Sequence, residues 1–144
     1  MFLENLSETL LFGKNFAQNL KPLSILLLKG PIGAGKTSFV QGIANGLLIN
    51  ESITSPTFAL SQHYYSGKIP LIHMDFYRLK DKLSAEELFL EEEEELNQNG
   101  GIMIIEWPEI ILPVIDMYTL IEFSYGKEFG RYYKIINHQK SKKS

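Results

Sequence analysis

The sequence predicts an α/β fold in which helices cover both faces of a mixed, partly antiparallel central sheet, giving a three-layer sandwich. An apolar run at residues 24–29 (SILLLK) leads through a glycine-rich loop into a helical pattern at residues 36–48. Two strand-like stretches, 57–65 and 69–76, flank a Ser-Gly-Lys turn that is typical of an antiparallel hairpin. A second apolar run, 102–106 (IMIIE), has the character of a buried strand.

Length and composition favour one domain. The chain has 144 residues, of which 44% are hydrophobic, enough for one core. It has no cysteine, which excludes disulfides and thiolate metal sites. No apolar run approaches the ~20 residues that a membrane span needs, and the N-terminus lacks the pattern of a secretory signal. We therefore expect a soluble, cytoplasmic protein without membrane contact, with residues 1–137 as a single domain and 138–144 as a basic, disordered tail.

The first half of the chain should begin with an amphipathic helix within residues 4–19, with Ser7 as its N-cap. Pro22 separates this helix from the strand at 24–29. The next helix, 36–48, is expected to face the core through Phe39, Val40, Ile43, Ala44 and Leu47.

The second half is expected to contain a helix at residues 84–96, with Ser84 as N-cap and Glu87 at the capping-box position. Two alternating stretches, 118–124 and 130–136, should complete the sheet after the strand at 102–106.

Charge is unevenly distributed along the chain, although the net charge is only −3. Residues 81–95 contain eight acids and one lysine, whereas residues 127–144 contain six basic residues and one acid. The two regions should attract different partners, with a solvated helix face and a frayed tail as the simpler alternatives. The basic tail favours RNA phosphates, but no base-reading module accompanies it.

Residues 30–37 (GPIGAGKT) match the phosphate-binding pattern G-x-x-x-x-G-K-[ST] in full, between an expected strand and an expected helix. In such a loop, glycines let backbone N–H groups converge on phosphate oxygens, and the helix N-terminus adds the positive end of its dipole. We expect Lys36 to reach the β- and γ-phosphates and the Thr37 hydroxyl to bind Mg²⁺. The pattern predicts a P-loop NTPase-like protein. Its expected nucleotide-binding residues here are Gly33, Ala34, Gly35, Lys36, Thr37 and Ser38.

ATP is favoured over GTP, because the sequence lacks the Asn-Lys-x-Asp segment that reads guanine. The carboxylate that completes a magnesium site is expected from a strand end, either Asp75 or Glu106, and the other acid would orient a water molecule. The chain has two arginines, Arg78 and Arg131, and neither lies in a lid-like helical segment. Since phosphoryl transfer commonly uses arginine to stabilise charge, we expect slow ATP hydrolysis by the chain alone, with a partner completing the site.

Four segments, in this order, resemble the bacterial TsaE (YjeE) family of ATPases: GPIGAGKTS at 30–38, TSPTF at 54–58, HMDFYRL at 73–79 and EWPE at 106–109. The resemblance implies a role in the threonylcarbamoyladenosine modification beside the anticodon of tRNAs that read codons beginning with A. It also implies binding to a heterodimer of the threonylcarbamoyl-transferase subunit and its partner. In that family ATP hydrolysis supports multiple turnover, and we expect tRNA to be contacted through the complex.

The resemblance also suggests roles for individual residues. Glu106 matches the magnesium-associated acid of the family, and Asp75 matches the acid of its HxDxYRL motif. Their division of labour stays open. Thr57 lies in the segment that resembles a switch-like loop near the γ-phosphate, with a turn made by Ser55 and Pro56 as the alternative.

Two further matches concern the ends of the chain. Thr9 and Gly13 resemble the family's N-terminal T-x-x-x-G, which lies near the adenine. Gly130 and Arg131 resemble a C-terminal Gly-Arg, which suggests Arg131 as a nucleotide contact; a surface arginine on an edge strand is the alternative. The sequence departs from the family at Ser38, where threonine is frequent, and in its more acidic helix.

Four further residues, His63, His73, Trp107 and Arg78, have expected roles of their own. His63 and His73 are expected to be packed residues and not metal ligands, and Trp107 is a core residue or a ring exposed where Pro108 turns the chain out of the sheet. Arg78 would serve the nucleotide, the partner or tRNA.

The alternative function is a small-molecule, nucleoside-like P-loop kinase, for which the chain leaves little room. A nucleotide-gated interaction module with negligible catalysis is the third possibility.

Overall fold

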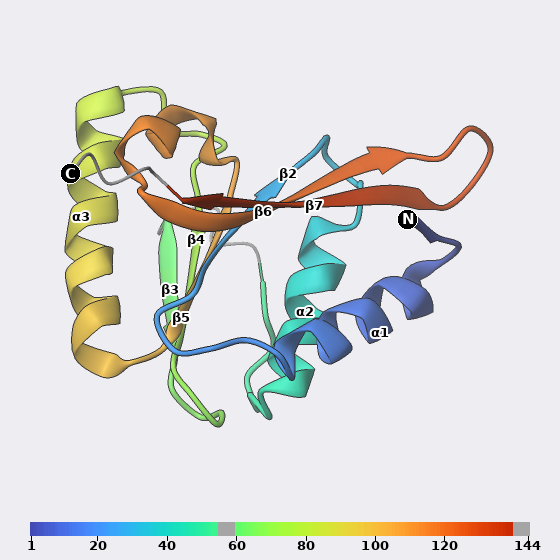
Figure 1. Ribbon diagram of the computed structural model, residues 1–144, viewed down its shortest axis with the longest axis horizontal. Helices are drawn as coiled ribbons and strands as arrows, with labels where there is room; N and C mark the ends of the chain where they lie inside the picture. The colour runs from blue at the N-terminus through green and yellow to red at the C-terminus, as the bar shows by residue number, and fades with distance from the viewer. Residues whose placement is uncertain (55–59, 140–144) are drawn as a thin grey trace.

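The computed structural model describes residues 1–54 and 60–139. These residues form a sheet with the strand order β1-β7-β6-β2-β5-β4-β3 (Figure 1). The strands are β1 (Phe2–Leu3), β2 (Ile25–Lys29), β3 (Ser61–Tyr64), β4 (Leu71–Asp75), β5 (Ile102–Glu106), β6 (Met117–Tyr125) and β7 (Arg131–Gln139). The helices are α1 (Leu6–Ala17), α2 (Lys36–Gly46), α3 (Lys82–Asn99) and the 3-10 helix η1 (Pro108–Val114).

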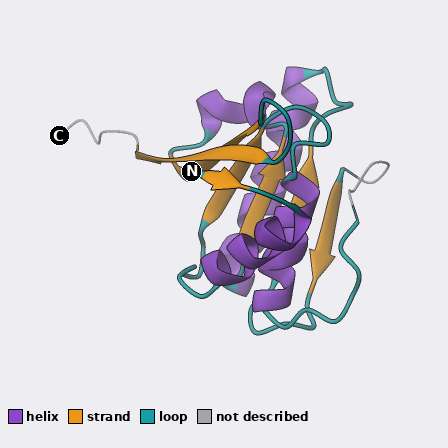
Figure 2. Cartoon of the chain, turned by 90° about the vertical axis from the view of Figure 1, so that its right-hand side faces the viewer, coloured by secondary structure: helices purple, strands orange, loops and turns teal. Residues whose placement is uncertain are grey.

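The sheet is parallel at its centre and antiparallel at both sides. β2 pairs in parallel with β5 and β6, and β4 pairs in parallel with β5. β3, β7 and β1 join as antiparallel strands. Helix α3 lies on one side of β3–β5, and helices α1 and α2 lie on the other (Figure 1). In Figure 2, turned by 90°, the strands lie between the helices nearer to the viewer and those behind the sheet. The prediction of a three-layer α/β sandwich with a mixed sheet is confirmed.

Strand alternation divides the core into two clusters, one on each face of the sheet. Leu26 and Leu28 of β2 pack with the residues of α2, such as Phe39 and Ile43. Leu27, between them in sequence, packs with Phe89 of α3 on the opposite face. The central strands are buried on both faces, which explains their continuous apolar sequences.

Two predicted helix starts are wrong. Helix α1 is capped by Asn5, whose side chain accepts a hydrogen bond from the Glu8 N–H at 3.0 Å, and Ser7 lies inside the helix. Helix α3 is capped by Asp81, which accepts from the Ser84 N–H at 3.3 Å. In both cases an Asn or Asp upstream caps as well as serine does, so the helix extends to it.

The expected strands are present with shifted ends. β3 and β4 form the predicted antiparallel pair, although residues 57–59 of the first predicted stretch lie outside the described residues. β7 continues to Gln139, two residues into the segment expected as a tail. Among the described residues, no helix is both long and apolar enough to cross a membrane.

Helices α1 and α2 approach each other through glycine. A Cβ atom at Gly13 would lie 2.4 Å from the Phe39 carbonyl oxygen, and one at Gly42 would lie 2.3 Å from the Leu10 carbonyl oxygen. Both obstacles are backbone atoms, which cannot move without shifting a helix. Glycine is therefore required at the crossing, and it fixes where α1 lies relative to α2.

We predict that Gly13→Ala lowers the free energy of unfolding by roughly 1–3 kcal/mol, because overpacking forces backbone shifts. Urea denaturation measures this change. Lys14→Ala, at the next and exposed position of α1, is the control and should stay within about 0.5 kcal/mol. Helix propensity alone favours alanine over glycine by up to ~1 kcal/mol, so a Gly13→Ala protein that is more stable than the original by about this amount would contradict the close contact.

Candidate functional site

The segment between β2 and α2 is a tight glycine loop at the carboxyl end of the central strand β2. Gly33 and Gly35 have φ angles of 79° and 103°, which L side chains rarely adopt. Gly35 is the N-cap of α2, and the helix begins at Lys36. The first turn of a helix has backbone N–H groups without intrahelical partners, at the positive end of the dipole. The loop and helix start therefore provide a cradle for an anion.

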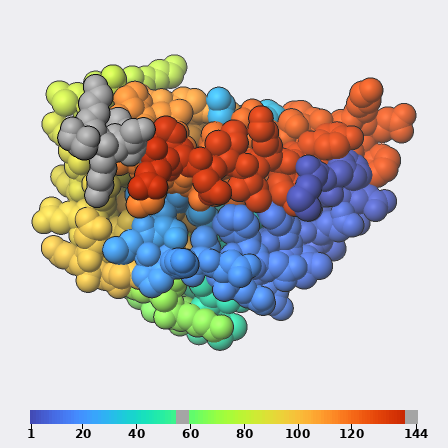
Figure 3. All heavy atoms as spheres, in the orientation of Figure 1, coloured from blue at the N-terminus to red at the C-terminus, as the bar shows by residue number. Residues whose placement is uncertain are grey.

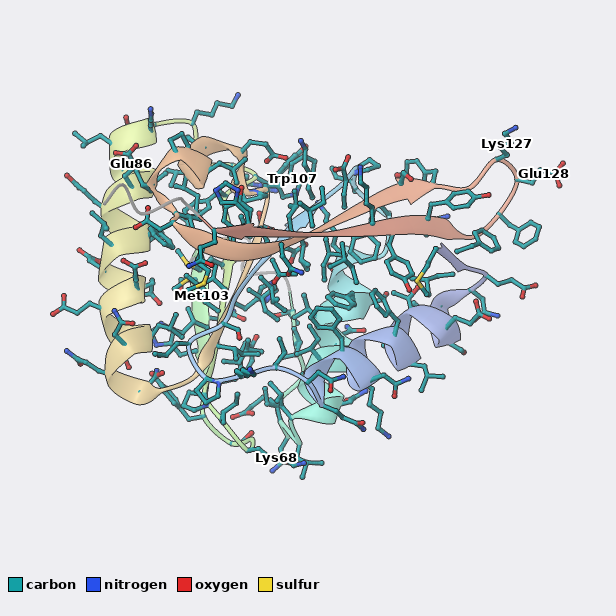
Figure 4. All side chains as sticks on the ribbon, viewed as in Figure 1. Lys68, Glu86, Met103, Trp107, Lys127 and Glu128 are labelled. Carbon is teal, nitrogen blue, oxygen red and sulfur yellow. The ribbon has the colours of Figure 1, made fainter. Side chains whose placement is uncertain are left out.

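A cavity of about 550 Å³ lies beside this loop, a size in the range of ~300–1,000 Å³ that is usual for small-molecule sites. Its wall includes the predicted site residues Thr9, Gly33, Gly35, Lys36, Thr37, Ser38, Asp75, Glu106 and Arg131. Arg78 also lines it. Figure 4 shows Trp107, another lining residue, at one end of the sheet and Lys68 at the opposite end. Residues far apart in sequence thus meet at one edge of the fold.

The structure places two predicted nucleotide-binding residues away from the cavity wall. Ala34 is buried in the core, and its N–H donates to the Pro31 carbonyl oxygen at 3.1 Å. Gly13, which the resemblance placed near the adenine, lies at the α1–α2 crossing, whereas Thr9, one helical turn earlier, lines the cavity. Thr57 lies outside the described residues.

Lys36 has a buried ammonium group. The residue is 5% exposed, and its Nζ has no hydrogen-bond partner among the described residues. The Nζ atom lies 3.7 Å from the centroid of the Trp107 ring. Burial lowers the pKa of Lys36, and the charges of Glu106, Asp75 and Glu109 oppose that shift. The ring offers a cation–π contact, but the three N–H donors still need an acceptor such as a phosphate oxygen.

The two predicted carboxylates end neighbouring strands. Asp75 of β4 and Glu106 of β5 are register partners. Strand alternation directs both side chains to the sheet face that α2 covers, because Leu71 and Ile104, at even spacing before them, pack in the α2 cluster. Asp75 Oδ1 accepts from the Tyr77 N–H at 2.8 Å, and Glu106 Oε2 lies 2.7 Å from His73 Nε2. The site therefore has two acids whose positions are fixed by hydrogen bonds.

Arg131 connects the last strand to the glycine loop. Its Nε and Nη2 atoms donate to the Gly33 carbonyl oxygen at 3.1 Å and 3.0 Å. The guanidinium lies 4.8 Å from the centroid of the Tyr125 ring, and the Tyr125 hydroxyl donates to the Ile32 carbonyl oxygen. β7 is not an edge strand at Arg131, because Leu3 of β1 pairs with this residue. Arg131 both lines the cavity and braces the loop.

The donor set fits a magnesium–nucleotide complex. The Thr37 hydroxyl and the carboxylates of Asp75 and Glu106 supply oxygen, the ligand type that Mg²⁺ prefers. Among the described residues there is no group of three His, Asp or Glu side chains that would hold a metal ion. Mg²⁺ is usually held by one or two protein carboxylates together with phosphate oxygens, so a full protein cage is not required. The Lys36 ammonium and the glycine loop complement the phosphates.

Several wall residues were not predicted from the sequence as site residues. Trp107 follows Glu106 directly, with a left-handed φ of 54°, and β5 ends before it as the chain enters η1 at Pro108. The turn out of the sheet at Pro108 is therefore confirmed, but nothing in the sequence linked the ring to Lys36. The N-terminal residues 3–6 also line the cavity. Figure 3 shows the N-terminal segment beside β7, with which β1 pairs.

Comparison with known proteins gives consistent results. Residues 3–133 match the family described as "Threonylcarbamoyl adenosine biosynthesis protein TsaE". The chain is 40% identical over 134 residues to a "tRNA threonylcarbamoyladenosine biosynthesis protein TsaE" of Nostoc, with 91% of this chain and 81% of that protein covered. It is 48% identical over 110 residues to the protein of the same name in Rickettsia prowazekii, with 76% and 74% covered.

The fold agrees with these sequence matches. The crystal structure of YdiB from Bacillus subtilis superimposes with a TM-score of 0.77 at 27% identity, covering 96% of this chain and 83% of that chain. The family match spans most of the residues, including the glycine loop, both strand-end acids and Arg131. The chain therefore belongs to the TsaE family.

Proposed function

We propose that this protein binds ATP with Mg²⁺ and hydrolyses it slowly, as a component required for the N6-threonylcarbamoyladenosine modification of tRNAs that read codons beginning with A. The observation that carries the nucleotide part is the buried Lys36 ammonium, which has no hydrogen-bond partner among the described residues and faces a cavity beside a glycine loop. The names of the relatives support the pathway.

The roles of the residues follow from their positions. Lys36 binds the β- and γ-phosphates, and the loop and the start of α2 hold them through backbone N–H groups. Thr37 and Glu106 hold Mg²⁺, which neutralises phosphate charge when bound. Asp75, at the neighbouring strand end, orients the attacking water. Thr9 and the N-terminal wall take the nucleoside end of ATP.

We expect slow hydrolysis by the chain alone because one of the two arginines at the cavity, Arg131, is engaged with the glycine loop. Arg131 is already engaged with the Gly33 carbonyl oxygen, so it serves the loop more than the transferring phosphoryl group. An arginine that stabilises the transition state can be supplied by a partner. We propose that the heterodimer of the threonylcarbamoyl-transferase subunit and its partner stimulates turnover, and that tRNA is reached through that complex.

We predict that Lys36→Ala weakens ATP binding by about 1.5–3 kcal/mol, the usual value of a hydrogen bond to a charged group, or roughly 10- to 150-fold in Kd. Calorimetry with ATP and Mg²⁺ measures the change. Lys68→Ala removes the same charge from an exposed residue at the opposite end of the sheet (Figure 4) and should leave Kd unchanged. Equal binding by the Lys36→Ala protein and the original would reject the site.

We predict that the purified chain hydrolyses ATP well below the median enzyme rate of about ten per second, and that adding the transferase heterodimer raises the rate. Release of inorganic phosphate measures both. The stimulation should disappear with Lys36→Ala, which controls for ATPase activity carried by the partners.

Other results of this assay would contradict the proposal in distinct ways. Phosphorylation of a nucleoside would identify a kinase. A rate that the heterodimer leaves unchanged would reject stimulation by these partners. Nucleotide binding without any hydrolysis, with or without the heterodimer, would identify an interaction module.

A further inference from the structure

His73 is a polar side chain in the interior of the sheet. It lies in the middle of β4 and is fully buried. Its register partner on β5 is Ile104, and strand alternation places it on the same face as Leu71 and Asp75. Most buried polar side-chain atoms have a hydrogen-bond partner, so the contacts of this ring indicate what the side chain does.

The imidazole has one hydrogen-bond partner among the described residues. Its Nε2 atom lies 2.7 Å from Oε2 of Glu106, and Nδ1 has no partner within the part of the chain that the structure describes. When the Glu106 carboxylate is ionised it can only accept a hydrogen bond, and the tautomer of His73 that carries Nε2–H is then the donor. The ring thus hydrogen-bonds to one carboxylate oxygen, Oε2 of Glu106.

The hydrogen bond from His73 matters for Glu106 because this carboxylate lies at the cavity wall. It is the last residue of β5, 3% exposed, and lines the cavity together with Lys36. A glutamate side chain has several rotamers, and ordering it lowers its conformational entropy. A hydrogen bond from a rigid, fully packed ring selects one of these rotamers. With Oε2 engaged by His73, Oε1 is the oxygen that remains for a ligand.

We propose that His73 is a positioning residue, which holds the Glu106 carboxylate in the orientation that binds the metal ion of the nucleotide. The inference rests on the proposed magnesium–nucleotide function and adds to it a buried residue that is not among those lining the cavity. Groups that hydrogen-bond to metal ligands fix ligand orientation, and their loss typically weakens metal binding by about 10–100-fold. His73 therefore acts on metal affinity through Glu106.

The test is the Mg²⁺ dependence of ADP binding, measured by calorimetry with the full chain. His73→Phe keeps a ring of similar size and removes the donor. We expect the Mg²⁺ concentration for half-maximal enhancement of ADP binding to rise by about 10–100-fold, while ADP affinity in EDTA stays within twofold of the original. His73→Gln, which retains an N–H donor at a similar reach, should recover much of the metal affinity.

Ile104→Val is the matched control for packing, because Ile104 is the register partner of His73 and carries no polar atom. It should leave the Mg²⁺ dependence unchanged. If His73→Phe does not fold, His73→Met removes the same donor with a flexible apolar side chain and is measured in the same way. Thermal unfolding of each variant reports stability separately from metal affinity.

Three results would overturn the inference: an unchanged Mg²⁺ requirement in the variants without the donor, an equal loss of ADP affinity with and without Mg²⁺, or the same effect from Ile104→Val. These results are distinct from failure of the proposed function. If the original protein shows no Mg²⁺-dependent binding of nucleotide, both proposals fall. If it does and His73→Phe behaves identically, only the role of His73 is rejected.

Discussion

The common register of the parallel strands β2, β5 and β4 is the constraint on which the site depends. Leu28 pairs with Glu106, and Glu106 pairs with Asp75, so the carboxyl ends of three strands lie level at one edge of the sheet. A slip of one residue would turn every side chain of a strand to the opposite face. Glu106 would then face the α3 side, away from Lys36. The alternation of apolar side chains that fills the two core clusters therefore also places the Asp75 and Glu106 carboxylates on the same sheet face as Lys36.

The other parts of the cavity wall are held by contacts between distant segments. The glycine crossing of α1 and α2 brings the start of α1, with Thr9, beside the glycine loop. On the other side, Arg131 and Tyr125 hydrogen-bond to loop carbonyl oxygens from β7 and β6. Elements from both halves of the chain thus support the loop, in addition to the hydrogen bond between Ala34 and Pro31 within it.

The parts of the structure that the sequence predicts are those with strong local patterns. The strand-loop-helix around Lys36 follows from an apolar run and glycine spacing, and the placement of Asp75 and Glu106 follows from the rule that parallel strands end at one edge. The helix caps were wrong because Asn, Asp and Ser have similar capping preferences within a few residues. The contact of His73 with Glu106 depends on which strands are neighbours, and two-residue spacing from Asp75 was the one available signal. The contact of Arg131 with Gly33 depends on the pairing of β6 with β2 and of β7 with β6, a strand order that no local pattern shows.

The brace from Arg131 to Gly33 also relates to the order in which the protein is synthesised. The glycine loop at residues 30–37 is translated long before Arg131, the residue that braces it. β1 likewise must wait for β7 before it has a strand to pair with. At translation speeds of about 5–20 residues per second, the loop spends several seconds without its support. A nucleotide that binds the assembled site stabilises chains in which β7 has docked over those in which it has not, so the ATP binding proposed above would favour the folded chain only after β7 has paired.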